Sequence, residues 1–172
     1  YINNAGYSEW KPIESIDDDF LDDMIATNLK GVFWGCKAAA KVMKDNGSII
    51  NVSSLAGKRG SKNNSAYCAT KFAVNGVTQS LAKELGIKGI RVNAVCPVLV
   101  KTDGLVEALK DKLSPAAGAP EVFLKQFSDQ QSAMQRLPEA NEVSATCLFL
   151  GSEHASAITG QCINVDCGVL PQ

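Results

Sequence analysis

The sequence lacks the features that mark membrane proteins and nucleic-acid-binding proteins. No apolar run approaches the roughly 20 residues needed to cross a bilayer, and the longest one, residues 38–43, is interrupted by Lys41. The 17 basic and 18 acidic residues give a formal net charge of −1, which provides no electrostatic reason to bind nucleic acid or an anionic membrane surface. We therefore expect no nucleic-acid partner and no membrane partner.

The residues that usually bind metals are scarce or badly spaced. The only histidine, His154, follows Glu153 at an expected helix end and is predicted to lie at the surface. No two cysteines form a Cys-x-x-Cys pair, since they stand at positions 36, 68, 96, 147, 162 and 167. Scattered cysteines usually act as small buried apolar residues in a reducing compartment. The sequence predicts no metal site, no disulfide between Cys162 and Cys167, and a cytoplasmic location.

Two further absences concern the start of the chain. No glycine-rich turn of the G-x-x-x-G-x-G kind occurs anywhere, and the first residue is Tyr1 rather than methionine. Residues 1–3 read as the end of a strand that runs into a turn at Asn4, Ala5 and Gly6. We expect that N-terminal strands and helices of a longer chain are missing, which would leave one edge of the first strand unpaired.

The apolar pattern predicts an α/β fold in one domain. At 45% hydrophobic and 20% charged residues, the composition is ordinary for a protein with a buried core. Continuous apolar strands are predicted at 1–3, 48–52, 90–95 and 161–165, and helices at 15–44, 65–85 and 139–150. Strands of this kind that alternate with helices are typical of a doubly wound parallel sheet covered on both faces.

Residues 103–138 contain no strand pattern. They hold two amphipathic pieces at 105–113 and 121–134, whose apolar residues include Leu109, Phe123 and Phe127. A segment this long between regular elements is often functional. It is predicted to be a substrate-loop insertion, either one side of a pocket or a well-anchored loop.

The strongest chemical signal is Tyr67 with Lys71. Residues four apart on a helix project from the same face, and position 67 falls in the first turn of the expected helix. Hydride transfer to a ketone needs a proton donor at the carbonyl oxygen. A phenol with a pKa near 10 becomes a better base when an ammonium and a helix N-terminus favour phenolate. By itself the pair also arises easily by chance.

Two other polar residues stand where chemistry is possible. Ser54 follows the strand 48–52, and a hydroxyl at a strand end can donate to a carbonyl oxygen; it could equally cap a loop. Asn28 lies within an apolar helical stretch, where an amide is unfavourable without partners. It could hold a water or a bent backbone near Lys71, although a structural, fully bonded asparagine is the simpler interpretation.

Six blocks of the sequence resemble the classical short-chain dehydrogenases/reductases in order and spacing. They are Asn3-Asn4-Ala5-Gly6, Asn28, Ser54, Tyr67 with Lys71, Pro97 with Thr102, and Val165-Asp166-Cys167-Gly168. The resemblance covers the whole chain and implies a Rossmann-type fold, NAD or NADP as cofactor, and a homodimer or homotetramer. By comparison with the family's length, the missing N-terminal part would be roughly 80 to 90 residues.

The resemblance also assigns roles to individual residues. It makes Tyr67 the general acid/base, with Lys71 lowering its pKa and binding the nicotinamide ribose. Ser54 would orient the carbonyl, and Asn28 would support a water-linked proton path to Lys71. The cofactor would be bound by Asn4, Ala5 and Gly6 on its adenosine side, by Tyr67 and Lys71, and on the nicotinamide by Pro97, Val98 and Thr102.

The chain departs from the family pattern at two positions besides the absent glycine-rich turn. Val98 stands where the family usually has glycine, and a side chain there could crowd the nicotinamide. Cys167 replaces another glycine, which we interpret as a change in packing. The four-residue Tyr–Lys spacing favours the alcohol and carbonyl branch over enoyl reductases, which have a longer gap.

Two functions follow as hypotheses. The first is an NAD(P)-dependent oxidoreductase acting on a secondary alcohol or its ketone, with 3-oxoacyl thioesters, sugars and steroids all open as substrates. The alternative is a non-catalytic fragment or subunit that keeps the fold for oligomerisation or partner binding. The complete set of Asn28, Ser54, Tyr67 and Lys71 favours the enzyme, while the missing phosphate-binding turn favours the alternative.

Overall fold

The computed structural model describes residues 1–44 and 46–171. Its centre is a parallel sheet in which neighbouring strands follow the order β1-β2-β3-β4. The strands are β1 (Ile2–Asn3), β2 (Ser48–Val52), β3 (Arg91–Pro97) and β4 (Cys162–Val165). In this register Ile50 lies opposite Ile2 on one side and Asn93 on the other. The predicted α/β class and parallel sheet are confirmed.

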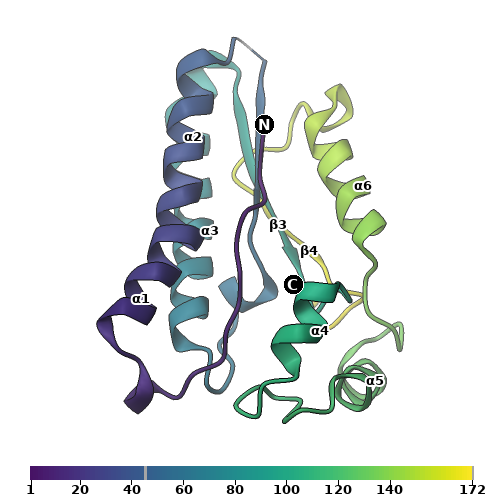
Figure 1. The fold of residues 1–172 in the computed structure, drawn as a ribbon. Helices are drawn as coiled ribbons and strands as arrows, with labels where there is room; N and C mark the ends of the chain where they lie inside the picture. The colour runs from purple at the N-terminus through teal and green to yellow at the C-terminus, as the bar shows by residue number, and fades with distance from the viewer. Residues whose placement is uncertain (45, 172) are drawn as a thin grey trace.

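Helices cover both faces of the sheet, as Figure 1 shows. On one face α2 (Gly31–Val42) packs against β1 and β2, and α3 (Ser65–Leu85) packs against β3. On the other face α6 (Ala140–Gly151) packs against β2, β3 and β4. The remaining helices are α1 (Asp18–Ile25), α4 (Asp103–Leu109) and α5 (Pro120–Gln131), with short 3-10 turns at Ile13–Ser15, Leu55–Gly57, Gly86–Lys88 and Glu153–Ala155.

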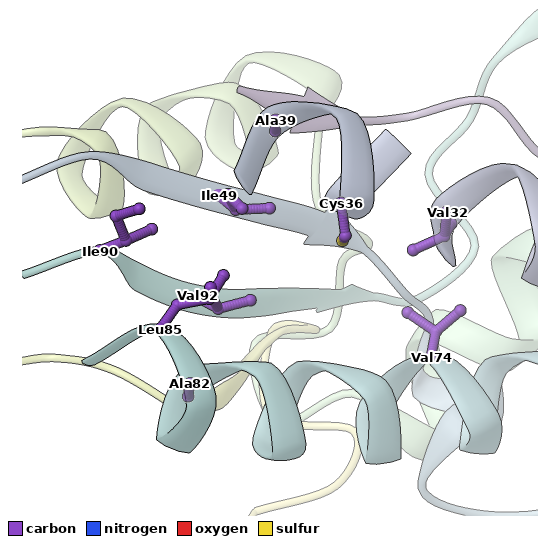
Figure 2. Close-up of a cluster of buried hydrophobic side chains, with 9 residues drawn as sticks. All are labelled: Val32, Cys36, Ala39, Ile49, Val74, Ala82, Leu85, Ile90 and Val92. Atoms are coloured by element: carbon purple, nitrogen blue, oxygen red, sulfur yellow. The ribbon is translucent and has the colours of Figure 1, made fainter. Parts of the chain in front are cut away.

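Successive side chains of a strand point to opposite faces of the sheet, and the central strands place apolar side chains on both faces. Ile49 packs with Val92 and the α2 and α3 side chains in the cluster of Figure 2. Its neighbour Ile50 packs on the other face with Val95 and Leu150. Burial on both sides explains why these strands read as unbroken apolar runs rather than as alternating patterns.

The helix predicted over residues 15–44 is divided into three parts, which corrects the expectation of one continuous helix. Asp17 rather than Ser15 caps its start, since the Asp17 carboxylate accepts from the Phe20 backbone N–H at 2.9 Å. Between α1 and α2, residues Ala26–Lys30 form a wider π-helical turn. A π-turn in a helix often marks a functional site, and this one contains Asn28.

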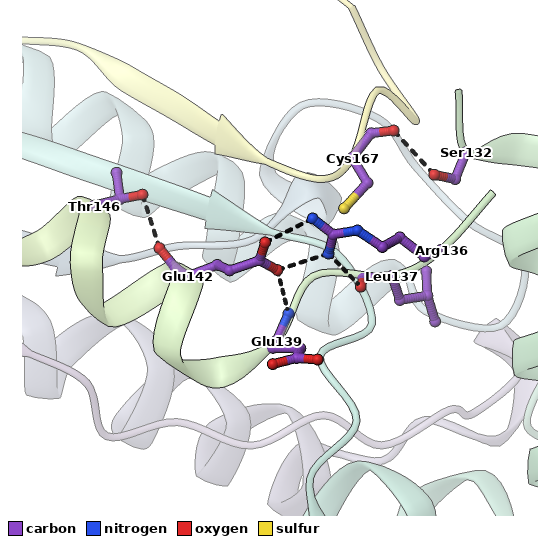
Figure 3. Close-up of polar contacts among 7 residues, drawn as sticks. All are labelled: Ser132, Arg136, Leu137, Glu139, Glu142, Thr146 and Cys167. Carbon is purple, nitrogen blue, oxygen red and sulfur yellow. Dashed lines mark hydrogen bonds and ion pairs between the residues drawn. The ribbon is translucent and has the colours of Figure 1, made fainter. Parts of the chain in front are cut away.

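The two amphipathic pieces at 105–113 and 121–134 overlap α4 and α5, which end earlier, at Leu109 and Gln131. The residues that follow α5 in the sequence make the polar contacts shown in Figure 3. The Arg136 guanidinium donates to both Glu142 oxygens, at 2.7 and 2.8 Å, and Ser132 donates its hydroxyl to the Cys167 carbonyl at 2.9 Å. These bonds connect the α4–α5 segment to the start of α6 and to the chain leaving β4.

The Cys167 backbone has a conformation that suits the glycine expected at this position from the family resemblance. Its φ is +53°, in the left-handed region that glycine adopts without strain. Val98 does not need a left-handed backbone. The residue with a positive φ in that segment is its neighbour Leu99, with φ of +35°. All six cysteines are free thiols, which agrees with the absence of a Cys162–Cys167 disulfide, and His154 is exposed as predicted.

Several large apolar side chains of the described residues are exposed, among them those of the outer strand and of α2. Among the described residues β1 is an outer strand of the sheet, and Tyr1 and Ile2 are 56% and 51% exposed. Phe33 and Trp34 on α2 are 46% and 56% exposed. No helix in residues 1–44 or 46–171 has the length and apolar character of a membrane span.

Candidate active site

A cavity of about 940 Å³ opens where the strands end. Its lining includes residues at or just after the ends of β1, β2 and β3, among them Asn4, Ser54 and Pro97. Residues from the first turns of α3 and from the α4–α5 segment complete it. Ligands of open parallel sheets bind at the carboxyl ends of the strands, so the cavity has the position expected of an active site.

Tyr67 and Lys71 meet in this cavity, as their spacing on α3 predicted. The Lys71 side chain crosses towards β2, where its ammonium donates to the Val52 carbonyl at 2.9 Å. The same Nζ lies 5.6 Å from the centroid of the Tyr67 ring. Lys71 is only 4% exposed, so a cationic group is held almost out of solvent beside a phenol.

Burial shifts both groups. It lowers the pKa of Lys71 from 10.5 to about 8 and raises the pKa of the Tyr67 phenol above 10. The pKa of Tyr67 is raised, whereas the sequence predicts that Lys71 lowers it. Desolvation of the phenolate dominates here, because Lys71 faces the ring and donates to Val52 instead of to the phenol oxygen. The phenol is therefore neutral at pH 7, the state of a proton donor.

Ser54 lies beside the phenol. Its side-chain interaction with Tyr67 opposes the rise of the Tyr67 pKa, and its Oγ accepts from the Ala56 backbone N–H at 3.1 Å. The Ser54 hydroxyl therefore both caps the short turn after β2, as the loop-capping interpretation proposed, and borders the cavity next to Tyr67. Two hydroxyl donors side by side can bind one carbonyl oxygen.

Asn28 stands behind the cavity and does not line it. Its side chain is fully buried, accepts from the Tyr7 backbone N–H at 2.9 Å and donates to the Tyr7 carbonyl at 2.8 Å. These bonds clamp the turn after β1 against the π-turn. A Cβ on Gly6 would meet Asn28 Oδ1 at 3.0 Å and Lys71 Nζ at 3.5 Å. The Asn28 side chain is thus hydrogen-bonded within the protein, and it holds the turn in which Gly6 lies beside Lys71.

Comparisons with known proteins identify the family of this chain. A family model described as enoyl-(acyl carrier protein) reductase matches residues 1–170. Diacetyl reductase [(S)-acetoin forming] of Staphylococcus aureus is 37% identical over 171 residues, which are 98% of this chain and 66% of that protein. L-2,3-butanediol dehydrogenase of Corynebacterium glutamicum is 37% identical over 174 residues, with the same shares covered. The chain belongs to the short-chain dehydrogenase/reductase family.

Solved structures agree with this membership. Sorbitol-6-phosphate 2-dehydrogenase from Erwinia amylovora superposes with a TM-score of 0.92 at 31% identity, covering 99% of this chain and 68% of that one. Aldohexose dehydrogenase of Thermoplasma acidophilum gives a TM-score of 0.89 at 32% identity, covering 99% and 70%. The chain spans 66% of the length of the two curated relatives named above.

The residues that the family resemblance assigns to the cofactor are placed as follows. Asn4, Gly6, Pro97, Val98 and Thr102 border the cavity together with Tyr67 and Lys71. Ala5 does not border it, and its side chain points to solvent-accessible surface. The Thr102 hydroxyl accepts from the Leu105 backbone N–H at 3.2 Å and so caps α4.

Val98 lies at the border between the cavity and the protein interior. It is 6% exposed and packs with Leu55 and Val169 in an apolar cluster. Part of its surface still borders the cavity. Because its backbone does not need a left-handed φ, a β-branched residue is tolerated at this position of the short-chain dehydrogenase/reductase chain.

Several residues of the site were missed by sequence reasoning. Ser53 is buried and donates its hydroxyl to the Lys71 carbonyl at 3.3 Å, and Asn75 donates to the Gly57 carbonyl at 2.9 Å. Gly57 allows this contact, since a Cβ there would lie 2.7 Å from the Lys71 carbonyl oxygen. A polar residue within an otherwise apolar helical face, as Asn75 is, was the available signal. Trp10 and the basic residues Arg59, Lys62 and Lys112 also line the cavity.

Proposed function

We propose that the protein is an NAD(P)-dependent oxidoreductase that transfers a hydride between a nicotinamide and a secondary alcohol or its ketone. The observation that carries this proposal is the grouping of Ser54, Tyr67 and buried Lys71 around one cavity at the carboxyl ends of the strands. The relatives named above as diacetyl reductase and butanediol dehydrogenase support it. The four-residue Tyr–Lys spacing favours this chemistry over enoyl reduction.

The cavity fits one end of a nicotinamide cofactor. Gly6 has no side chain to fill the space beside the Lys71 ammonium, where a Cβ would lie 3.5 Å from Nζ. Lys71 and Tyr67 would contact the ribose, and Pro97, Val98 and Thr102 would face the nicotinamide. When bound, the nicotinamide supplies or accepts the hydride; preference between NAD and NADP is left open.

The chain's own residues would handle the oxygen and its proton. Ser54 and Tyr67 donate to the substrate oxygen and hold it in place as negative charge develops. In the reducing direction Tyr67 gives its proton to that oxygen, and in the oxidising direction it takes the proton from the alcohol. Lys71, with a pKa of about 8, is mostly cationic at pH 7 and stabilises the phenolate left behind.

A direct test measures oxidation of NADH and of NADPH by the complete gene product, using diacetyl, acetoin and a set of larger ketones. We expect turnover of at least one ketone with one of the two cofactors. The non-catalytic alternative predicts the reverse, namely no turnover with any ketone or alcohol while the chain still assembles. A correctly folded complete protein that is inert in both directions would reject the enzymatic proposal.

The same proposal includes the α4–α5 segment, residues 103–138, as the substrate wall. Phe123 and Phe127 of α5 line the cavity with Leu105 and Ala108 of α4. Trp10 packs behind them with Leu109 and Leu124. An apolar wall of this kind suits the carbon skeleton of a ketone.

We further propose that the protein forms a homodimer or homotetramer through α2 and α3. Exposed Phe33 and Trp34 on α2, together with Phe72 on α3, 49% exposed, support this. Sedimentation of the complete gene product should show a dimer or tetramer, and a monomer at micromolar concentration would contradict it. A cytoplasmic location, which cell fractionation would test, is supported by the six free thiols.

A further inference from the structure

The charged residues that line the cavity are all basic. They are Lys71 at the catalytic centre and three others, Arg59, Lys62 and Lys112. Among residues 1–44 and 46–171 no aspartate or glutamate lines it, although the chain has 18 acidic residues against 17 basic ones. The potential in the cavity is therefore positive while the protein as a whole is close to neutral.

The three additional cations, which we call the basic rim, come from two segments of the chain. Arg59 and Lys62 belong to the loop between β2 and α3, and Lys112 belongs to the turn after α4. The two segments touch, since the Asn63 side-chain amide donates to the Leu113 carbonyl at 3.3 Å. Residues adjacent to Lys62 and Lys112 are thus in direct contact.

These cations lack protein partners. Among residues 1–44 and 46–171, Arg59, Lys62 and Lys112 take part in no ion pair. Other basic residues of the same region are paired: Lys110 with Glu107 at 2.6 Å, and Lys101 with Glu121 at 2.8 Å. The side chains that face the cavity are the ones whose charge is left for a ligand.

Helices α4 and α5 contribute apolar side chains to the cavity. Leu105, Ala108 and Phe123 line the cavity, and none of them can bind a charged or hydroxylated group. Lys71 is buried and Tyr67 is half-buried, whereas Lys62 and Lys112 are exposed. A substrate that spans the cavity would put its carbonyl at Ser54 and Tyr67 and its far end at the basic rim.

We infer that the substrate is an oxo or hydroxy compound with an anionic group, phosphate or carboxylate, at the end remote from the reacting carbon. Arg59, Lys62 and Lys112 bind that anion, and the α4–α5 wall contacts the carbon chain between the two ends. This rests on the proposed function and adds the substrate class. Arg59 presents a planar guanidinium suited to bidentate contact with such oxygens.

The test uses the complete gene product and matched ketone pairs. Straight-chain methyl ketones that end in carboxylate, beginning with levulinate, are compared with their methyl esters, and a hydroxyketone phosphate is compared with its dephosphorylated form. We expect kcat/KM for the anionic member to exceed that of its neutral partner by about tenfold or more at low ionic strength, with the advantage falling as salt is added.

Substitution locates the effect. Arg59→Gln, Lys62→Gln and Lys112→Gln should each raise KM for the anionic substrate by about threefold or more and leave kcat and the neutral substrate nearly unchanged. The triple variant should lose the preference altogether. Lys88→Gln removes an exposed lysine from the 3-10 turn Gly86–Lys88, outside the cavity, and should keep it.

Neutral and anionic ketones with equal kcat/KM, or a preference that survives in the triple variant, would overturn the inference while leaving the oxidoreductase proposal intact. A protein inert towards all ketones would reject that proposal instead. In that case calorimetric titration with levulinate and inorganic phosphate still decides the inference. Binding that the triple variant loses and Lys88→Gln keeps supports it, and equal or absent binding rejects it.

Discussion

Replacing Tyr67 with phenylalanine should lower kcat for ketone reduction at least about 100-fold, the loss expected when a positioned acid is removed. The substitution deletes only the phenol oxygen, so the half-buried ring and its contact with Lys71 remain. Cofactor affinity should therefore change little. Steady-state kinetics and a separate titration of NADH or NADPH into the complete gene product measure the two effects.

Tyr7→Phe is the matched control. Tyr7 borders the same cavity and its pKa is also raised, mainly by burial. Its side-chain hydroxyl forms no hydrogen bond within the described chain, and its contacts with Asn28 are made by the backbone. The control should stay within a few-fold of the parent enzyme. Activity of Tyr67→Phe within about fivefold of the parent would remove Tyr67 from the proton-donor role.

Much of the fold was predictable because its strands are buried on both faces. Burial of Ile49 and Ile50 on opposite sides leaves an uninterrupted apolar run, and the predicted strand 48–52 coincides with β2. The π-turn around Asn28 was not predictable. A wider turn adds only a small offset to the 3.6-residue periodicity, so the apolar pattern of residues 15–44 still reads as one helix.

The site shows a similar division. Spacing on a helix was sufficient to bring Tyr67 and Lys71 to one face, because four residues make about one turn. The direction of the Tyr67 pKa shift needed the structure, since it depends on how deeply the phenol is buried and on Lys71 bonding to Val52 instead. The basic rim also depends on tertiary contacts, because Lys62 and Lys112 are far apart in sequence and their segments touch through the bond from the Asn63 side chain to the Leu113 carbonyl.

Replacing Lys71 with methionine should separate activity from stability. Loss of the cation that supports the Tyr67 phenolate should lower kcat at least about tenfold. Stability should change in the opposite sense, because a buried lysine with a pKa of about 8 opposes folding at neutral pH. The free energy of unfolding of the variant should therefore exceed that of the parent at pH 7, less the cost of the lost bond to the Val52 carbonyl.

The pH dependence of this difference in unfolding free energy shows whether the charge of Lys71 causes it. The pKa of Lys71 is lower in the folded chain, about 8, than its ordinary 10.5. Below pH 8 both states are charged and the full penalty, about 3 kcal/mol, acts against folding. As pH rises from 8 to 10.5 the folded state loses its proton first, so the parent gains stability relative to methionine. The advantage of Lys71→Met should shrink by about 3 kcal/mol across that window.

Urea unfolding of the cofactor-free complete gene product at pH 7, 8, 9 and 10 measures this difference. Lys83→Met is the control, since Lys83 lies on the same helix but is exposed, and its effect should not vary over the window. Lys71→Arg keeps a cation that stays charged throughout. The difference in stability between Lys71→Arg and Lys71→Met should therefore not shrink at high pH. A Lys71→Met difference that is constant from pH 7 to 10 would mean that Lys71 is not held in an environment that disfavours its charge.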